Sequence, residues 1–187
     1  MMGSYSLPVT AVIGDREYPI HADYRDILDI FSYLEDPDLP EYLRWQIALA
    51  LFYEGEIPRS HIEQAARFLV NFIAGGQQPP QEKTGGKLFD WQQDAPAIIA
   101  DVNRVAGQEI RQHKFIHWWT FLSWFHAIGE GQLSTLVSIR DKLNRGKKLE
   151  EWEKDFYRQN KSRVDLPKRY SAEELQEQER LKALLDS

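Results

Sequence analysis

The sequence contains no cysteine among its 187 residues. Disulfide bonds, thiolate metal sites and thiol nucleophiles are therefore excluded. Residues 1–8 also lack the basic part and the apolar part of a secretory signal. These absences together predict a protein of the cytoplasm.

Motifs of common nucleotide-binding and hydrolytic enzymes are absent as well. The chain has no GxGxxG, no Walker loop and no GxSxG elbow, and Gly85-Gly86-Lys87 alone does not form a phosphate cradle. We therefore expect no cofactor, no catalytic residue and no enzymatic activity.

The chain has enough apolar material for a packed core. Apolar residues make up 42% of it and aromatic residues 12%, which excludes global disorder. At this length one domain is the default. We expect a single helical domain over residues 1–166 and a C-terminal helical extension over residues 167–187.

Charge is unevenly distributed along the chain. Residues 1–60 carry 11 acidic and 4 basic side chains, whereas residues 140–170 carry 11 basic and 6 acidic ones. Two solvated surfaces would explain this pattern. The alternative is complementary ends that pair between neighbouring subunits or bind a charged partner. A net charge of −6 disfavours nucleic acid as that partner.

The most apolar stretch is residues 115–128, which holds three of the six tryptophans and three phenylalanines. Read at helical spacing it is apolar on more than one face, as a helix surrounded by other helices is. It is too short to span a bilayer. We therefore predict a mainly α fold, a compact bundle of about six to eight helices around this buried tryptophan-rich helix.

The remaining segments predict a small N-terminal β-hairpin and a series of further helices. The hairpin covers residues 9–20, with Gly14-Asp15 as its turn. A flexible loop is expected over residues 75–87, which contain four glycines and two prolines. Apolar periodicity and caps predict helices over residues 23–34, 40–53, 60–75, 133–143, 147–164 and 172–185. A further helix is expected to start between Asp90 and Asp94 and to end or kink at Gly107.

Three groups of side chains could carry chemistry, and each has a simpler explanation. His113 and His117 are four residues apart, a spacing that places two metal ligands on one helix face, but no glutamate follows His113 and no third ligand stands at a set distance. The pairs Asp23–Asp26 and Asp90–Asp94 are better explained as helix caps and first-turn acids than as paired catalytic carboxylates.

The third group is the tryptophan cluster Trp118, Trp119 and Trp124, which could stack on bases or sugars. Its helical spacing favours core packing instead, because aromatic side chains usually supply core burial. No metal site is therefore expected, and His117 is interpreted as a hydrogen-bonded core histidine.

Several stretches together resemble the bacteriophage "gene product fifteen" family of phages and prophages of Gram-positive bacteria. They are residues 18–28 with the motif Asp23-Tyr24-Arg25, residues 89–95 with Phe89-Asp90-Trp91, and the signature His117-Trp118-Trp119-Thr120-Phe121. Ile139-Arg140 and Phe156-Tyr157 fit the rest, so that the resemblance runs from about residue 9 to residue 166. The matched residues are interpreted as fold determinants: Asp23, Arg25, Asp94, His117, Trp118, Trp119 and Phe121.

The resemblance implies a protein of phage tail assembly. We expect a non-enzymatic, self-associating chaperone that coats the tape-measure protein in the cytoplasm of the bacterial host. Its partners would be the tape-measure protein, other tail proteins and further copies of itself, with no membrane and no nucleic acid. A structural component of the virion tail is the first alternative, and a nucleic-acid-binding regulator that uses residues 140–170 is the second.

Overall fold

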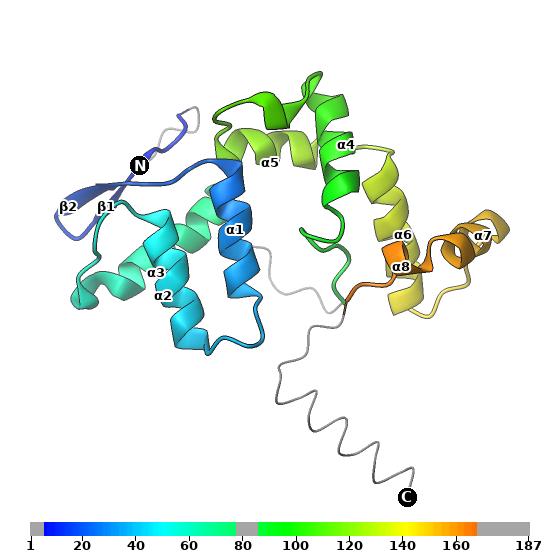
Figure 1. Ribbon diagram of the computed structural model, residues 1–187, viewed down its shortest axis with the longest axis horizontal. Coiled ribbons are helices and arrows are strands. Elements are labelled where there is room, and N and C mark those ends of the chain that lie inside the picture. Colours follow the sequence, from blue (N-terminus) through cyan, green and yellow to red (C-terminus); the bar gives the residue numbers. More distant parts are fainter. Residues whose placement is uncertain (1–5, 78–85, 168–187) are drawn as a thin grey trace, which may run out of the picture.

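The computed structural model of the chain describes residues 6–77 and 86–167 and is mainly α-helical (Figure 1). Eight α-helices, two short 3-10 helices and one β-hairpin lie in these ranges, which confirms the predicted fold class. In chain order they are β1 (Thr10–Ile13), β2 (Arg16–Pro19), α1 (Tyr24–Leu34), α2 (Glu41–Phe52), η1 (Arg59–His61), α3 (Ile62–Ile73), α4 (Ala95–Ala106), η2 (Ile110–Gln112), α5 (Trp118–His126), α6 (Gln132–Asn144), α7 (Glu151–Gln159) and α8 (Lys161–Val164). Most of the predicted loop 75–87 and nearly all of the predicted extension 167–187 lie outside the described residues.

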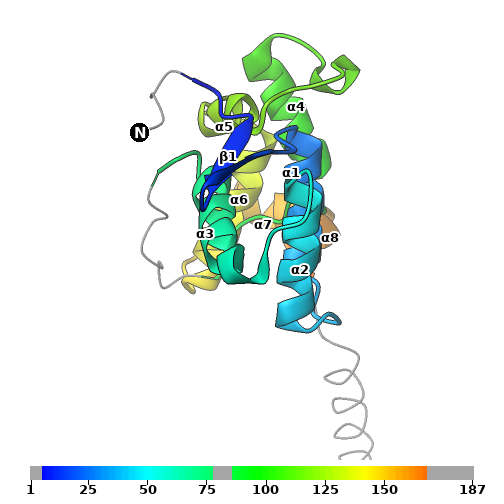
Figure 2. The same ribbon diagram turned by 90° about the vertical axis from the view of Figure 1, so that its left-hand side faces the viewer.

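The elements form two groups joined by α5. The hairpin and helices α1–α3 lie at one end of the long axis, and α6–α8 lie at the other (Figure 1). Helix α5 contacts α1 of the first group and α4, and α4 in turn contacts α6 of the second group. In the view turned by 90°, β1 lies against α3 (Figure 2), a contact that keeps the hairpin on the helices. The tryptophan-rich segment therefore links the two groups.

The hairpin forms as predicted. Ala11 pairs with Tyr18 and Ile13 with Arg16 in an antiparallel ribbon, and Gly14 takes a φ of +65° in the turn, where a glycine is favoured. Ala11, Ile13 and Tyr18 are buried while Val12 is 61% exposed, the alternation of a half-buried strand. A two-stranded ribbon is marginal alone, so this buried face supplies its stability.

The second and third helices differ in detail from the predicted segments 40–53 and 60–75. Only Ala48, Leu49 and Phe52 of α2 are buried, whereas Leu51 is 37% exposed, because α2 packs between α1 and α3 and turns its other side to solvent. Ser60, the first residue of the predicted helix 60–75, does not cap α3. It lies in η1, and α3 begins at Ile62 with no side-chain cap.

Helix α5 is shorter than the predicted 115–128 segment. Residues before Trp118 are extended, because Trp118 N–H donates to the Ala22 carbonyl at 2.7 Å and Tyr24 N–H donates to the Ile116 carbonyl at 2.9 Å. Phe115 is consequently 57% exposed, in contrast to its predicted burial. Trp118, Phe121 and Leu122 form the buried face of α5.

The predicted helix over 147–164 is two helices, α7 and α8. The break is at Asn160, whose backbone N–H and side-chain amide both donate to the Phe156 carbonyl, so this side chain competes with helix continuation. Trp152 on α7 is 55% exposed and is not a core residue. Helix α4 ends as predicted at Gly107, which has a φ of +68°.

None of the helices in residues 6–77 and 86–167 combines the length and the apolar composition of a membrane-spanning segment.

Candidate functional site

Arg140 is buried on α6 and forms an ion pair with Asp94. Its two terminal nitrogens donate to the two carboxylate oxygens of Asp94 at 2.6 and 2.9 Å, and the side chains are 4% and 1% exposed. The guanidinium also donates to the backbone carbonyls of Leu88, Arg163 and Val164 at 2.6–3.0 Å. All five of its N–H groups are thus engaged, and Arg140 fastens α6 to the turn before α4 and to α8.

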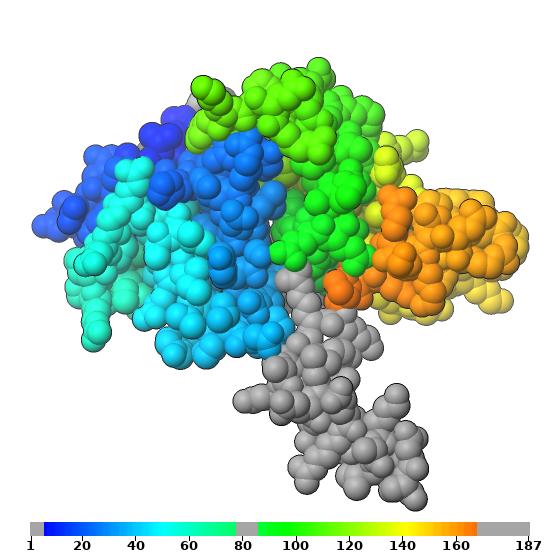
Figure 3. All heavy atoms as spheres, viewed as in Figure 1, coloured from blue at the N-terminus to red at the C-terminus, as the bar shows by residue number. Residues whose placement is uncertain are grey.

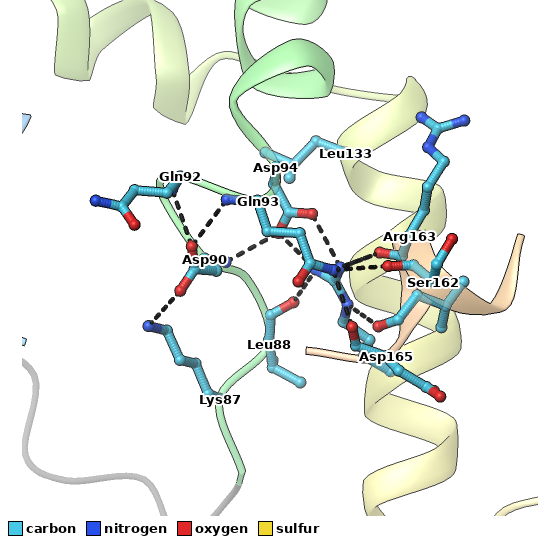
Figure 4. A network of polar contacts seen from close by, with 12 residues as sticks. Lys87, Leu88, Asp90, Gln92, Gln93, Asp94, Leu133, Ser162, Arg163 and Asp165 are labelled. Carbon is cyan, nitrogen blue, oxygen red and sulfur yellow. Dashed lines mark hydrogen bonds and ion pairs between the residues drawn. The ribbon is translucent and has the colours of Figure 1, made fainter. Parts of the chain in front are cut away.

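Asp90 organises that turn (Figure 4). Its carboxylate accepts hydrogen bonds from the backbone N–H groups of Gln92 and Gln93 at 2.9 Å and from the Lys87 ammonium at 3.0 Å. Burial alone would raise the pKa of Asp90, but the Gln93 N–H, the Lys87 ammonium and the Gln92 N–H outweigh burial and hold that pKa below its usual value. Asp94 accepts from the Asp90 N–H at 2.9 Å, so the two carboxylates brace one turn.

The side chain of Gln93 ties the same turn to the C-terminal end of the described chain. Its amide nitrogen lies 3.0 Å from the Arg163 carbonyl oxygen and 2.9 Å from the Asp165 carbonyl oxygen. In Figure 4 these carbonyls converge on Gln93 beside Leu88. The residues that follow α8 are therefore held against residues 88–94.

An apolar cleft of about 560 Å³ opens beside this turn, between α1, α5 and α6. Glu35 and Lys87, joined by a 2.7 Å ion pair, provide its polar lining. The apolar lining residues are Leu88, Phe89, Trp91, Phe125, Leu133 and Val137. The volume lies within the range of small-ligand and side-chain sites, and the lining fits an apolar guest.

A second polar junction joins the start of α1 to the segment before α5. Asp23 caps α1 by accepting from the Arg25 N–H at 3.0 Å, and its other oxygen accepts from the Ile116 N–H at 2.8 Å. The Arg25 guanidinium binds the Asp23 carboxylate and also donates to the backbone carbonyls of His113 and Lys114. Asp23 and Arg25 therefore satisfy backbone groups that a helix start and an extended segment leave open.

His117 caps α5. Its Nδ1 accepts from the Trp119 N–H at 3.0 Å, so its Nε2 carries the proton and donates to the Pro8 carbonyl at 2.9 Å. Burial lowers the pKa of His117, partly offset by the Pro8 carbonyl. His113 lies at the end of η2 and not on α5, so the two histidines do not share a helix face.

Trp118, Trp119 and Phe121 join α5 to the end of α3. The indole N–H of Trp118 donates to the Ile73 carbonyl at 2.9 Å, and that of Trp119 donates to the Phe72 carbonyl at 2.8 Å. Trp118 and Phe121 are 1% and 0% exposed. The rings of Trp118 and Phe121 lie in the core, whereas Trp119 and Trp124 are partly buried and pack against it. Core packing is thus confirmed for Trp118 and holds only in part for the other two tryptophans of the predicted cluster.

The structure divides the predicted motif residues between two places. Asp23, Arg25 and His117 meet at the junction of α1 with α5, and Trp118, Trp119 and Phe121 lie next to them. Asp94 lies away from this junction, in the ion pair with Arg140. The interpretation of these residues as fold determinants remains a prediction.

Sequence reasoning missed the Asp94–Arg140 pair and the cleft. One signal for the pair was present, because Leu133, Leu136 and Arg140 fall on one helical stripe at positions i, i+3 and i+7. A charged residue in an apolar stripe indicates a buried partner. The cleft had no such signal, since its lining comes from four separate segments.

The polar groups of the two junctions are engaged in hydrogen bonds within the protein. Asp23, Asp90 and Asp94 each accept several hydrogen bonds from the protein, and His117 uses both ring nitrogens. Among the described residues, no group of three or more His, Asp or Glu side chains is arranged to hold a metal ion.

A family model described as "Bacteriophage Gp15 protein" matches residues 5–166. No curated protein matches the chain, and no solved structure does.

Proposed function

The chain belongs to the Bacteriophage Gp15 protein family, and from this membership we propose that it is a chaperone of phage tail assembly. It associates with itself and coats the tape-measure protein in the cytoplasm of the bacterial host while the tail tube grows. The family match, which covers 5–166, is the observation that carries the proposal. At the coarser level the chain is a structural or assembly protein of a phage.

The distribution of charge along the molecule supports self-association. The acid-rich residues of the hairpin, α1 and α2 lie at one end of the long axis, and the base-rich residues of α6–α8 lie at the other (Figure 3). Burial raises the pKa of Asp26, and the nearby carboxylates of Asp23 and Asp29 raise it further. A cation from a second copy would relieve this repulsion. Contacts between unlike ends are head-to-tail and extend into rows of subunits, which suits a protein that coats a long partner.

The placement of the ionisable groups supports a non-enzymatic role and weighs against the nucleic-acid regulator. The carboxylates and His117 at the two junctions are engaged in fixed backbone contacts. Cations that would form a phosphate-binding surface on α6–α8 are instead paired with neighbouring carboxylates: Arg145 with Asp141, Lys154 with Glu151, Arg158 with Asp155 and Lys161 with Asp165. These pairs occupy four of the cations, and the net charge of −6 over the whole chain disfavours a polyanion as the partner.

The proposal is tested by light scattering coupled to size exclusion, on the protein alone and after co-expression with the tape-measure protein encoded beside it. We expect a large, defined complex in the second sample. Separate elution of the two proteins at micromolar concentration would contradict the chaperone.

Charge reversal tests the self-association. The variant Asp29→Lys/Glu41→Lys changes two exposed acids at the acidic end and is expected to weaken association of the protein with itself. Glu130→Lys, an exposed acid between α5 and α6, is the matched control and is expected to behave as the unmodified chain. Equal association of all three proteins would contradict the head-to-tail contact.

Mass spectrometry of purified particles separates the chaperone from a structural tail component. A chaperone is depleted from the finished virion relative to the tail-tube protein. A fixed, stoichiometric amount in the particle would favour the structural role.

A further inference from the structure

The cleft beside residues 87–91 is lined mainly by apolar side chains, which are neither donors nor acceptors in the two polar junctions. Phe89, Trp91 and Phe125 line it with their rings. The ring centroid of Trp91 lies 5.0 Å from that of Phe89 and 5.0 Å from that of Phe125. Leu133 and Val137 of α6 form the facing wall. A lining of this composition favours an apolar guest that is excluded from water.

The described chain ends next to this cleft. The carbonyl of Asp165 is held by the amide of Gln93 at 2.9 Å, and the carbonyl of Leu88, a cleft residue, is held by Arg140 at 3.0 Å. Arg140 also holds the Val164 carbonyl at 2.6 Å. Residues 164–165 and residue 88 are therefore bound to the same side chains, and the segment after Pro167 starts beside the cleft.

The sequence of that segment has a matching apolar stripe. Ser171-Ala172-Glu173-Glu174 is a capping box that predicts a helix start, and Leu181, Leu184 and Leu185 stand at i, i+3 and i+4, the spacing of a helix that lies in a groove. A helix this short is marginal in water without a partner. The other segment near the cleft in sequence, 78–85, contains no large apolar side chain.

We propose that residues 171–185 dock as an amphipathic helix in the apolar cleft of their own chain. The leucine stripe faces Phe125, Leu133 and Val137. Three residues separate Pro167 from Ser171, and so short a connection gives the segment a millimolar effective concentration at a nearby site. The occupant is therefore the chain's own C-terminal helix and not that of a second copy.

The absence of cysteine allows a direct test by engineered disulfides in the full chain. The variant Val137→Cys/Leu184→Cys places one thiol in the cleft and one on the leucine stripe. Leu51→Cys/Leu184→Cys is the control, since Leu51 is exposed on α2. Mild oxidation is expected to close an intramolecular bond in the first variant at least about tenfold faster than in the control, because a disulfide needs the two backbones close together. Equal rates, or a disulfide-linked dimer as the main product, would overturn the proposal.

Amide hydrogen exchange gives a second test that does not depend on the cleft variant. In the full chain we expect protection of residues 174–185 that Leu184→Asp removes while the amides of α1–α6 keep theirs. Ala183→Asp is the matched control, because residue 183 lies on the opposite side of such a helix, and it is expected to retain protection. Exchange of residues 174–185 at the rate of an unstructured peptide in the unmodified chain would refute the docking.

Discussion

Replacing Arg140 by alanine is expected to be among the most destabilising single changes in this protein. The substitution leaves the Asp94 carboxylate, which is 1% exposed, without its cation. It also removes the donors to three backbone carbonyls, those of Leu88, Arg163 and Val164. Truncating one partner of a buried ion pair typically costs about 3–5 kcal/mol of unfolding free energy. That is a large fraction of the total stability of a domain.

The free energy of unfolding is measured by urea titration followed by circular dichroism and by tryptophan fluorescence. Arg158→Ala is the control, because Arg158 is an exposed arginine paired with Asp155 at i, i+3, and its loss is expected to change stability by less than about 0.5 kcal/mol. Arg140→Lys is expected to fall between the two, since an ammonium cannot reproduce the planar fork of donors.

A double-mutant cycle tests the reasoning further. Asp94→Ala/Arg140→Ala is expected to cost clearly less than the sum of the two single variants, because neither charge is then left buried without a partner. A loss under about 1 kcal/mol for Arg140→Ala, or additive single losses, would refute the role assigned to the pair.

Three smaller perturbations test other parts of the fold. Gly76→Ala is expected to destabilise the protein more than Gly107→Ala in thermal unfolding. Both glycines have a positive φ, which costs a residue with a side chain about 1–2 kcal/mol, but only at Gly76 would the new Cβ lie 3.0 Å from the Trp119 ring. Equal losses of stability in the two variants would contradict that contact. Asp23→Ala is expected to lower the free energy of unfolding by more than the roughly 1 kcal/mol of a simple N-cap, and Asp23→Asn is expected to lower it less than Asp23→Ala. An unchanged free energy of unfolding for Asp23→Ala in urea titration would contradict the interpretation of Asp23 as a fold determinant. Burial lowers the pKa of His117 in the folded state. The contribution of the neutral imidazole to stability is therefore present above about pH 6.5, the ordinary histidine value, and is lost as the pH falls below that value. Between pH 7.5 and pH 5 the urea midpoint of the unmodified protein is expected to fall more steeply than that of His117→Asn, and equal pH dependence of the two midpoints would exclude this role.

The composition and the periodicity of the sequence determined the kind of fold. The hairpin follows from strict alternation around Gly14-Asp15, and α1 follows from Asp23 as a cap with Ile27 and Ile30 on one face. These signals are local, because a turn, a cap and a helical stripe each involve residues within a few positions of one another. The sequence alone also showed the charge asymmetry between the two ends of the chain, and the H-W-W-x-F signature indicated the family.

The lengths and exposed faces of the helices required the tertiary structure. Residues 115–117 continue the apolar run of α5, but backbone hydrogen bonds with residues 22–24 keep them extended. Helix α2 is apolar on two sides, and only its position between α1 and α3 decides which side is buried. Hydrophobicity alone does not distinguish these outcomes.

The two polar junctions and the cleft also depended on contacts between distant segments. Asp94 and Arg140 are 46 positions apart, and nothing local in the sequence pairs one carboxylate with one guanidinium. The cleft is lined by the end of α1, residues 87–91, α5 and α6, which come together only when the chain folds. Caps, turns and stripes are set by neighbours in sequence, whereas a buried ion pair and a cavity are set by neighbours in space, and for this chain that difference separates what the sequence determined from what the fold decided.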